Sequence, residues 1–335
     1  MKKKIILGLL VSAFLIYLAV RGIRFEEVIG VLKNVRYVYI PPALMLMFLM
    51  QVLRSYRWGI ILSPLKKVDQ LSLFSVTCVG FLAIVAIPAR LGELARPYLI
   101  SNKSNIKMTS AMGTILVERV LDGLAILVMA VSVYFFLPLP SGLTEKSFIF
   151  FLITMAIVVV MIFTIVKPEM SLKALNPFLK FIPKRYAPAL NRLIHNVIDG
   201  FKIITRIRAL LYVMFLSGLI WLIGVLIIYI LFFAFGFHLS PVAAFVLMII
   251  LVIGIAIPAA PGFIGTWHLS CILGLGLFGV PEPDALAFAV IYNFLSVGIV
   301  ITLGLIFLPF NKFSFSGFSL QLSEGQEKED SKLSG

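Results

Sequence analysis

The sequence predicts an all-α fold, a polytopic bundle of transmembrane helices. Apolar residues make up 61% of the 335-residue chain and charged residues only 13%, and the mean hydropathy is +1.08. Because so apolar a chain cannot cover its core with polar surface, most of its exterior must be solvated by lipid. The same composition excludes intrinsic disorder, and the two cysteines are too few for a disulfide scaffold.

Eight apolar stretches are candidates for crossing the membrane, since a helix needs about 20 residues to cross about 30 Å of hydrocarbon. The first stretch follows three lysines and suits either an uncleaved helix or a signal peptide; the lack of a small-x-small cleavage site before Arg21 favours the helix. Residues 1–312 then form one transmembrane domain, and the polar residues 313–335 form a disordered tail. The stretches are 5–20, 39–61, 71–89, 113–137, 148–166, 209–235, 241–258 and 285–309.

The distribution of basic residues predicts the topology, because lysine and arginine collect in cytoplasmic loops. Four regions are basic: the N-terminus, residues 54–69, residues 90–107, and the loop 167–208, which has nine basic and two acidic residues. Eight full spans cannot place all four in the cytoplasm, whereas a re-entrant hairpin at 71–89 can. We therefore predict about six spanning helices plus two re-entrant segments in the inner cell membrane, with the N-terminus and the loop 167–208 cytoplasmic.

The loop 167–208 also has a predicted partner. Its apolar residues between 190 and 204 recur at helical spacing, with basic residues between them. This pattern predicts an amphipathic interfacial helix that lies on anionic lipid headgroups. The net charge of +14 is thus assigned to membrane loops, and no nucleic-acid partner is predicted.

An internal repeat indicates how the second re-entrant segment arises. Residues 86–92 (AIPARLG) and 256–262 (AIPAAPG) are identical at five of seven positions. Three spans between the copies would place the second upside down, as in the inverted repeats of many transporters. Irregular backbone at membrane depth needs protein or water partners, so Pro88, Pro258 and Pro261 point towards a cavity. Alternatively, each proline simply ends a helix at the interface.

One charged cluster follows the first repeat. Arg90, Glu93 and Arg96 fall at i, i+3 and i+6, so that on a helix Glu93 can pair with either arginine. The planar guanidinium group binds phosphate through two parallel hydrogen bonds. The cluster is therefore a candidate site for a phosphate group.

A second charged cluster lies inside an apolar stretch. Glu118, Arg119 and Asp122 occur within 113–137, and Asp122 lies about 13 Å along the helix from Gly113. Unpaired carboxylates at that depth are costly, so each must be protonated, pair with an arginine or face water. The cluster is either an ion-pair network of Glu118 and Asp122 with Arg90, Arg96 or Arg119 that holds the bundle together, or part of a substrate or proton pathway.

The second repeat carries polar and glycine residues as well. Pro261, Gly262, Gly265 and His268 leave open backbone that suits close approach of a headgroup, while the neighbouring Trp267 is alternatively an interfacial anchor. The sequence contains no P-loop, no nucleophile elbow and no metal-spaced Cys/His set. We therefore predict no cofactor, and ATP-driven transport within this chain is excluded.

Three motifs, PARLGELARP at 88–97, ERVLD at 118–122 and PGFIGT at 261–266, resemble those of the lysylphosphatidylglycerol synthase transmembrane family. This is the flippase-like domain of the multiple peptide resistance factor. The resemblance implies a domain that moves lipid between leaflets, and it carries substrate-binding roles over to six matching positions. These are Arg90, Glu93, Arg96, Glu118, Arg119 and Asp122.

The sequence departs from the family pattern in the third motif. The family has a second glycine after Pro-Gly and an acidic residue soon after, where this chain has Phe263 and His268. A histidine there would make the site sensitive to pH. The synthase domain of the larger relatives is also absent from the sequence, so lysyl transfer would require a separate transferase as partner.

Three functions remain open from the sequence. The first is a flippase for an anionic or aminoacylated phospholipid or a lipid-linked substrate. The second is a membrane enzyme or transferase component that acts on a phospholipid or polyprenyl-phosphate carrier, with the intramembrane carboxylates as acid and base. The third is a non-transporting protein that recruits a separate transferase through its basic loop.

Overall fold

The computed structural model describes residues 17, 21, 23–87, 92–136, 206–256 and 260–311. These residues form α-helices joined by short turns, with no β-strand among them, which confirms the helical membrane bundle. Three of the described segments are long and apolar enough to cross a membrane, namely Tyr37–Leu62, Ile207–Phe235 and Glu282–Phe307. Outside the described residues lie the predicted stretch 5–20 except Tyr17, the stretch 148–166, nearly all of the loop 167–208, and the tail 313–335.

The helices follow the predicted apolar stretches closely and add three that hydropathy did not indicate. The additional helices are α2, α5 and α12, which are short or rich in polar and glycine residues. In the first half of the chain the elements are α2 (Phe25–Lys33), η1 (Tyr37–Tyr39), α3 (Ile40–Leu62), α4 (Gln70–Ala86), α5 (Ala95–Ser104) and α6 (Met108–Phe136). In the second half they are α10 (Ile207–Phe235), α11 (Pro241–Ala256), η5 (Pro261–Phe263), α12 (Thr266–Gly276), α13 (Glu282–Phe307) and η6 (Pro309–Asn311).

Local sequence explains where several helices begin and end. The backbone N–H of Ser72 donates to the carboxylate of Asp69 at 2.7 Å and so caps the start of α4. Helix α4 ends at Ala86 because Ile87 precedes a proline and takes an extended conformation. Helix α10 ends at Gly236, whose positive φ of 69° allows the left-handed turn that closes many helices.

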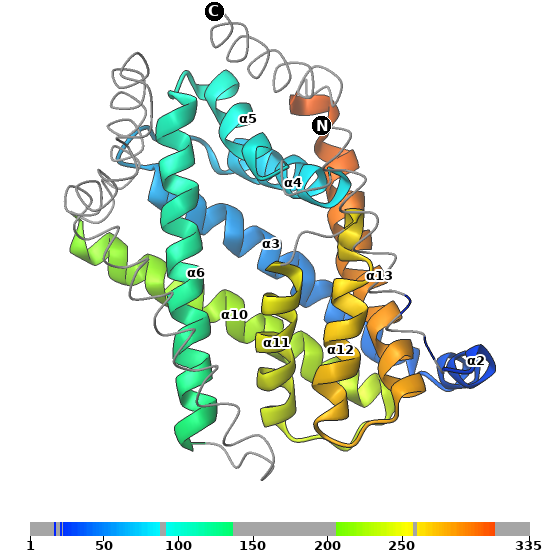
Figure 1. Cartoon of the computed structure of the whole chain (residues 1–335). Helices are drawn as coiled ribbons and strands as arrows, with labels where there is room; N and C mark the ends of the chain where they lie inside the picture. Colours follow the sequence, from blue (N-terminus) through cyan, green and yellow to red (C-terminus); the bar gives the residue numbers. More distant parts are fainter. Residues whose placement is uncertain are drawn as a thin grey trace, which may run out of the picture.

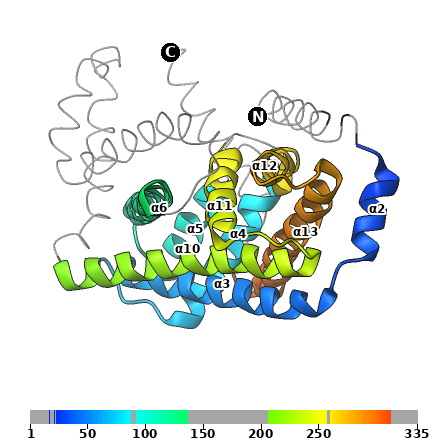
Figure 2. The ribbon, with the colours of Figure 1, turned by 90° about the horizontal axis from the view of Figure 1, so that it is seen from below.

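The long helices form two crossed groups. Helices α3 and α10 lie side by side, and Figure 2 shows them running together along one face of the molecule. In the same view α6 is seen nearly end-on, so it crosses the α3–α10 pair at a steep angle. Helix α13 packs against α12 and α4, and α2 packs against α13 at the edge of the bundle.

Helices α4 and α5 form a hairpin that starts and finishes at one end of the molecule. The Lys66 ammonium group, in the loop before α4, donates to the backbone carbonyl of Ser104, the last residue of α5, at 2.8 Å. The hairpin occupies the upper part of Figure 1. This is the arrangement that a re-entrant segment requires.

Helices α11 and α12 form a second hairpin with the opposite direction. The two helices pack against each other, and the connections at 236–240 and 277–281 both lie at the lower end of Figure 1. In the sequence, the repeats 86–92 and 256–262 fall between α4 and α5 and between α11 and α12, that is, between the two helices of each hairpin. Two helical hairpins that open towards opposite ends have the geometry expected of an inverted repeat.

Candidate functional site

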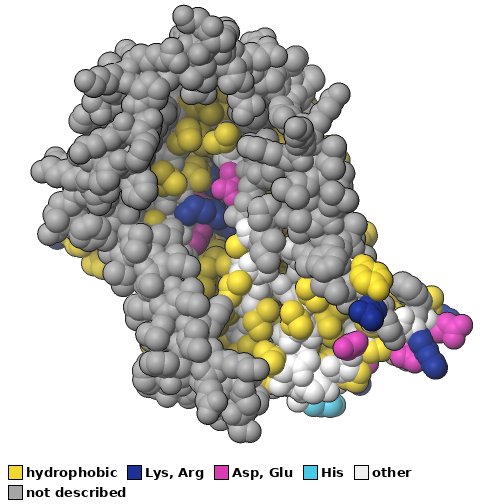
Figure 3. All heavy atoms as spheres, viewed as in Figure 1, with side chains coloured by type: hydrophobic (Ala, Val, Ile, Leu, Met, Phe, Trp, Pro, Cys, Tyr) yellow, Lys and Arg dark blue, Asp and Glu magenta, His cyan; other side chains and the backbone are white. Residues whose placement is uncertain are grey.

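A cavity of about 250 Å³ lies where the two hairpins meet α3, α6, α10 and α13. Figure 3 shows a hollow in which basic and acidic side chains gather among hydrophobic ones. The charged lining residues are Arg54, Arg57, Glu93, Glu118, Arg119 and Asp122. Most other lining residues are apolar or aromatic, among them Met47, Phe81, Met248, Val252, Trp267 and Val300. The cavity is therefore polar in one part and apolar along the rest.

Arg57 occupies the centre of the charged part and is only 1% exposed. Its Nη1 lies 2.5 Å from Oδ1 of Asp122 and donates to the hydroxyl of Ser217 at 2.8 Å. Its Nη2 lies 3.0 Å from Oε1 of Glu118. One guanidinium group thus connects α3, α6 and α10.

Arg96 forms the second arm of the network. Its Nη1 and Nη2 each donate to one carboxylate oxygen of Glu118 at 3.1 Å, which makes a two-bond pair between α5 and α6. Its guanidinium carbon lies 4.3 Å from the ring centroid of Trp58, whose indole N–H donates to the hydroxyl of Thr114. Because both charged groups are fully buried, the pair satisfies charges that would otherwise be costly at this depth.

Arg119 and Trp221 complete the contacts of the two carboxylates. Nη2 of Arg119 lies 3.4 Å from Oε1 of Glu118 and 3.6 Å from Oδ2 of Asp122. The indole N–H of Trp221 donates to Oδ1 of Asp122 at 3.1 Å. The carboxylates of Glu118 and Asp122 are therefore paired with arginines, as in the ion-pair alternative, and the network also lines the cavity.

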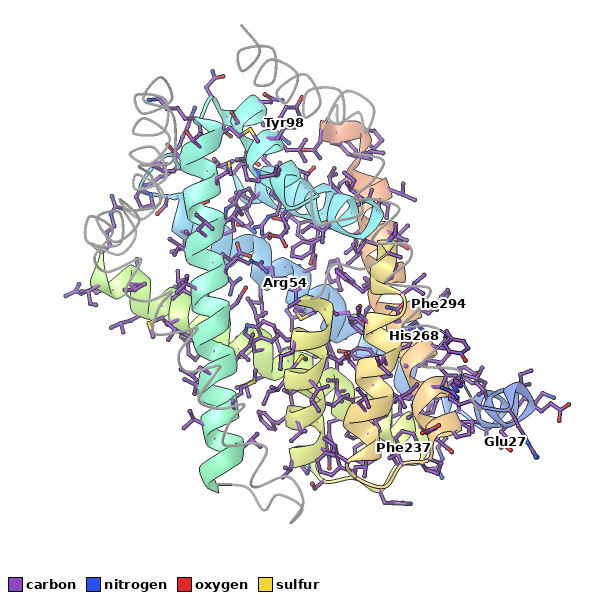
Figure 4. All side chains as sticks on the ribbon, viewed as in Figure 1. Glu27, Arg54, Tyr98, Phe237, His268 and Phe294 are labelled. Atoms are coloured by element: carbon purple, nitrogen blue, oxygen red, sulfur yellow. The ribbon has the colours of Figure 1, made fainter. Side chains whose placement is uncertain are left out.

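Arg54 lies one helical turn before Arg57 and has a different environment. Its guanidinium carbon lies 5.1 Å from the ring centroid of Phe81, and Figure 4 places Arg54 in the middle of the bundle. Among the described residues, no carboxylate lies within ion-pair distance of Arg54. The N–H donors of Arg54 are therefore not taken up by the ion-pair network of the described residues.

The prediction that Arg54 and Arg57 belong to a basic loop at 54–69 was wrong. Helix α3 continues to Leu62, so both arginines lie inside the bundle and the loop retains only Lys66 and Lys67 as basic residues. The criterion applied to Glu118 would have found them, because both also fall inside an apolar stretch, 39–61.

The structure brings together most of the predicted charged residues. The cavity is lined by Glu93, Glu118, Arg119 and Asp122. Arg96 does not line the cavity but contacts Glu118, which does. Two partners were expected for Arg96, namely Glu93 in its own segment and, in the ion-pair alternative, Glu118 or Asp122; the structure pairs Arg96 with Glu118. Arg90 and the prolines Pro88 and Pro258 lie outside the described residues.

The second repeat contributes less to the cavity than the sequence suggested. Phe263 and Trp267 line the cavity, and the buried Gly262 accepts a hydrogen bond from the Asn293 amide at 3.0 Å. Pro261 is exposed and Gly265 immediately precedes α12. His268 is half-buried and is not among the lining residues; Figure 4 places it on the α12 side of the molecule.

The described part of the chain offers no set of three His, Cys, Asp or Glu side chains positioned to bind a metal ion. The charged part of the cavity consists of guanidinium and carboxylate groups. These groups bind anions and ion pairs through hydrogen bonds and charge.

The fold and the site define a class of protein: a helical membrane protein with opposed hairpins around a cavity that is charged at one end and apolar elsewhere. The family model "Lysylphosphatidylglycerol synthase TM region" matches residues 5–304, and the chain belongs to this family. The resemblance inferred from the three motifs is thereby confirmed.

Relatives of similar length support this assignment. A UPF0104 membrane protein of Methanothermobacter thermautotrophicus is 24% identical over 322 residues, which cover 91% of this chain and 94% of the relative. The UPF0104 membrane protein MJ1595 of Methanocaldococcus jannaschii is 24% identical over 310 residues, covering 89% and 92% of the two chains. No solved structure shows significant similarity to the chain.

Proposed function

We propose that this protein moves an anionic or aminoacylated phospholipid, or a lipid-linked substrate, between the leaflets of the cell membrane. The observation that supports this function best is the two-part character of the cavity. A lipid has a charged headgroup and apolar chains, and the cavity offers guanidinium groups at one end and aliphatic and aromatic side chains along the rest. Family membership supports a membrane role related to lipids.

The cost of the charged cluster also supports a functional role. Ionisable side chains inside a membrane are expensive and commonly mark substrate or ion pathways. Here Arg57, Arg96, Glu118 and Asp122 are all buried or nearly so. A bundle held together by apolar packing alone would avoid that cost.

The opposed hairpins supply a mechanism for exposing the cavity to each leaflet in turn. In transporters built from inverted repeats, the substrate lies near the midplane where the repeats meet, and one repeat rocks against the other. The cavity lies between the α4–α5 and α11–α12 hairpins. Movement of one hairpin relative to the other would open it towards one face at a time.

The enzymatic alternative receives less support from the geometry. General acid–base catalysis needs a carboxyl group that can exchange a proton with the substrate. Glu118 is held by three arginines and Asp122 by two. Ion pairing favours a structural and electrostatic role for both groups.

Reconstitution into liposomes tests the proposed function. Phosphatidylglycerol with a fluorescent label near its headgroup is placed in both leaflets. Dithionite does not cross the membrane, so it quenches only the labelled lipid of the outer leaflet. We expect the wild-type protein to raise the quenched fraction above that of protein-free liposomes, and to leave the chemical identity of the lipid unchanged on chromatography. Quenching equal to protein-free liposomes, with or without a pH gradient, would contradict transport, and a chemically altered lipid would favour the enzyme.

A further inference from the structure

Arg54 differs from every other described cation of the site in having no carboxylate partner. Arg57 and Arg119 contact both Glu118 and Asp122, and Arg96 is bound by Glu118 through two hydrogen bonds. Arg54 lines the same cavity and its guanidinium carbon lies over the ring of Phe81, with no ion pair to a carboxylate among the described residues. Its donors are therefore available to a ligand.

The position of Arg54 suits a ligand held in the charged part of the cavity. Gln51, Arg54 and Arg57 follow at i, i+3 and i+6 on α3, and all three line the cavity. The ring of Phe81 covers one face of the Arg54 guanidinium at 5.1 Å, which leaves its edge, where the N–H groups lie, for hydrogen bonding. A planar fork of this kind matches two oxygens of a phosphate.

The balance of charges around the cavity indicates which lipid is favoured. Arg57, Arg96 and Arg119 are ion-paired with Glu118 or Asp122. Arg54 lines the same cavity with no carboxylate within ion-pair distance among the described residues, so its positive charge is left for a ligand to neutralise. A phosphodiester lipid with one negative charge neutralises it, whereas a lysylated lipid, which has a net positive charge, brings like charges together in a medium of low polarity.

We propose that Arg54 is the phosphate-binding residue of the cavity and selects a lipid with a single net negative charge over its lysylated derivative. This inference rests on the proposed function and narrows its substrate class from "anionic or aminoacylated" to anionic. The ion-paired arginines act as positioning residues: they hold α3, α5, α6 and α10 so that Arg54 faces the cavity.

Tryptophan fluorescence provides a direct binding assay, because the three tryptophans of the chain all lie at the site. Trp58 stacks on Arg96, Trp221 donates to Asp122, and Trp267 lines the apolar part. Lipids with brominated chains quench them on entry. Detergent-solubilised protein is titrated with brominated phosphatidylglycerol, brominated lysyl-phosphatidylglycerol and brominated diacylglycerol, which keeps the chains but lacks the phosphate.

The variants isolate the charge of Arg54 from other effects. Arg54→Gln should weaken binding of brominated phosphatidylglycerol by about tenfold or more and leave diacylglycerol unchanged. Arg54→Lys keeps the positive charge but loses the planar guanidinium group, so its affinity for phosphatidylglycerol should lie between those of the wild type and Arg54→Gln. Arg24→Gln removes an arginine whose side chain is 82% exposed on the surface and should bind like the wild type. If Arg54→Gln does not fold, Arg54→Lys serves as the test. The inference then requires that Arg54→Lys weaken binding of phosphatidylglycerol and leave binding of diacylglycerol unchanged.

The inference would be overturned by unchanged phosphatidylglycerol binding in the Arg54 variants, by equal losses for diacylglycerol, or by wild-type binding of the lysylated lipid as tight as that of phosphatidylglycerol. Displacement of the lipid by millimolar inorganic phosphate would identify a free anion as the ligand and would also overturn it. Binding that depends on Arg54 without any lipid exchange in liposomes contradicts only the proposed function. Exchange that is unaffected by Arg54→Gln contradicts only the role of Arg54.

Discussion

Glu118 accepts two hydrogen bonds of 3.1 Å from the guanidinium of Arg96, and the two groups are 0% and 2% exposed. The same carboxylate also lies 3.0 Å from Arg57 and 3.4 Å from Arg119. A single acidic side chain on α6 therefore serves arginines of α3, α5 and α6 itself. This makes Glu118 the residue on which the packing of the charged part depends most.

Loss of this carboxylate charge should destabilise the bundle strongly. Glu118→Gln leaves Arg57 and Arg96 buried with less compensation, and breaking a buried pair in this way costs about 3–5 kcal/mol. Thermal unfolding in detergent, followed by tryptophan fluorescence, measures the change. Glu27→Gln, at an exposed ion pair of 3.9 Å with Arg24, should change stability by less than about 1 kcal/mol. Equal effects of the two substitutions would show that Glu118 has no such role.

The tip of the first hairpin should tolerate no side chain at Gly92. A Cβ there would run into the backbone carbonyl group of Ala83 on α4, so the two segments would have to separate. We expect Gly92→Ala to lower stability by about 1–3 kcal/mol. Gly30→Ala, within α2 and with open space around it, should be neutral or stabilising, because alanine favours helix by about 1 kcal/mol. A melting temperature of Gly92→Ala at or above the wild-type value would refute the close contact.

The cap of α4 should respond to pH. The N–H of Ser72 holds the pKa of Asp69 below its ordinary value near 3.8. A lowered folded-state pKa means that the cap stabilises the protein above that ordinary value and loses its effect as pH falls through the folded-state pKa. Asp69→Asn should therefore flatten the dependence of melting temperature on pH below about 4. A wild-type slope in the asparagine variant would locate the acid sensitivity elsewhere.

The opposed hairpins predict a labelling pattern. Lys67→Cys and Lys103→Cys lie at the open end of α4–α5, and His238→Cys and Glu282→Cys lie at the open end of α11–α12; all four positions are exposed. The two native cysteines are buried. A membrane-impermeant thiol reagent should label the first pair only from the cytoplasmic side and the second pair only from the outer side. Labelling of all four from one side would rule out opposed hairpins.

The sequence was sufficient for most of the helical framework. Hydropathy placed α3, α4, α6, α10, α11 and α13 within a few residues, because each is a long apolar run that ends at proline, glycine or charge. Helices α5 and α12 were missed because α5 is polar, with Arg96 and Lys103 in ten residues, and α12 contains two glycines. Their helical form depends on packing against α4 and α11, which no local pattern reveals.

The composition of the site and its pairs with Arg96 and Arg119 were predictable from the sequence, but the pairs with Arg57 were not. The charges at 118, 119 and 122 stood out because they interrupt an apolar stretch. Arg57, which pairs with both Glu118 and Asp122, lies 65 residues before Asp122 in the sequence, and no spacing rule links the two. Arg54 and Arg57 were not identified as site residues because they were counted as loop residues. The positive-inside rule already accounts for arginines in a cytoplasmic loop, so no functional role was sought for them.

The central claim is that lipid crosses the membrane through the cavity, and blocking the cavity tests it most directly. Val252 lines the apolar part, so Val252→Trp would fill much of the space, whereas Val128→Trp makes the same change at a position 62% exposed on α6. In the liposome assay we expect Val252→Trp to reduce exchange of phosphatidylglycerol to the protein-free level and Val128→Trp to exchange it like the wild type. Exchange at the wild-type rate by a folded Val252→Trp protein would contradict a route through this cavity.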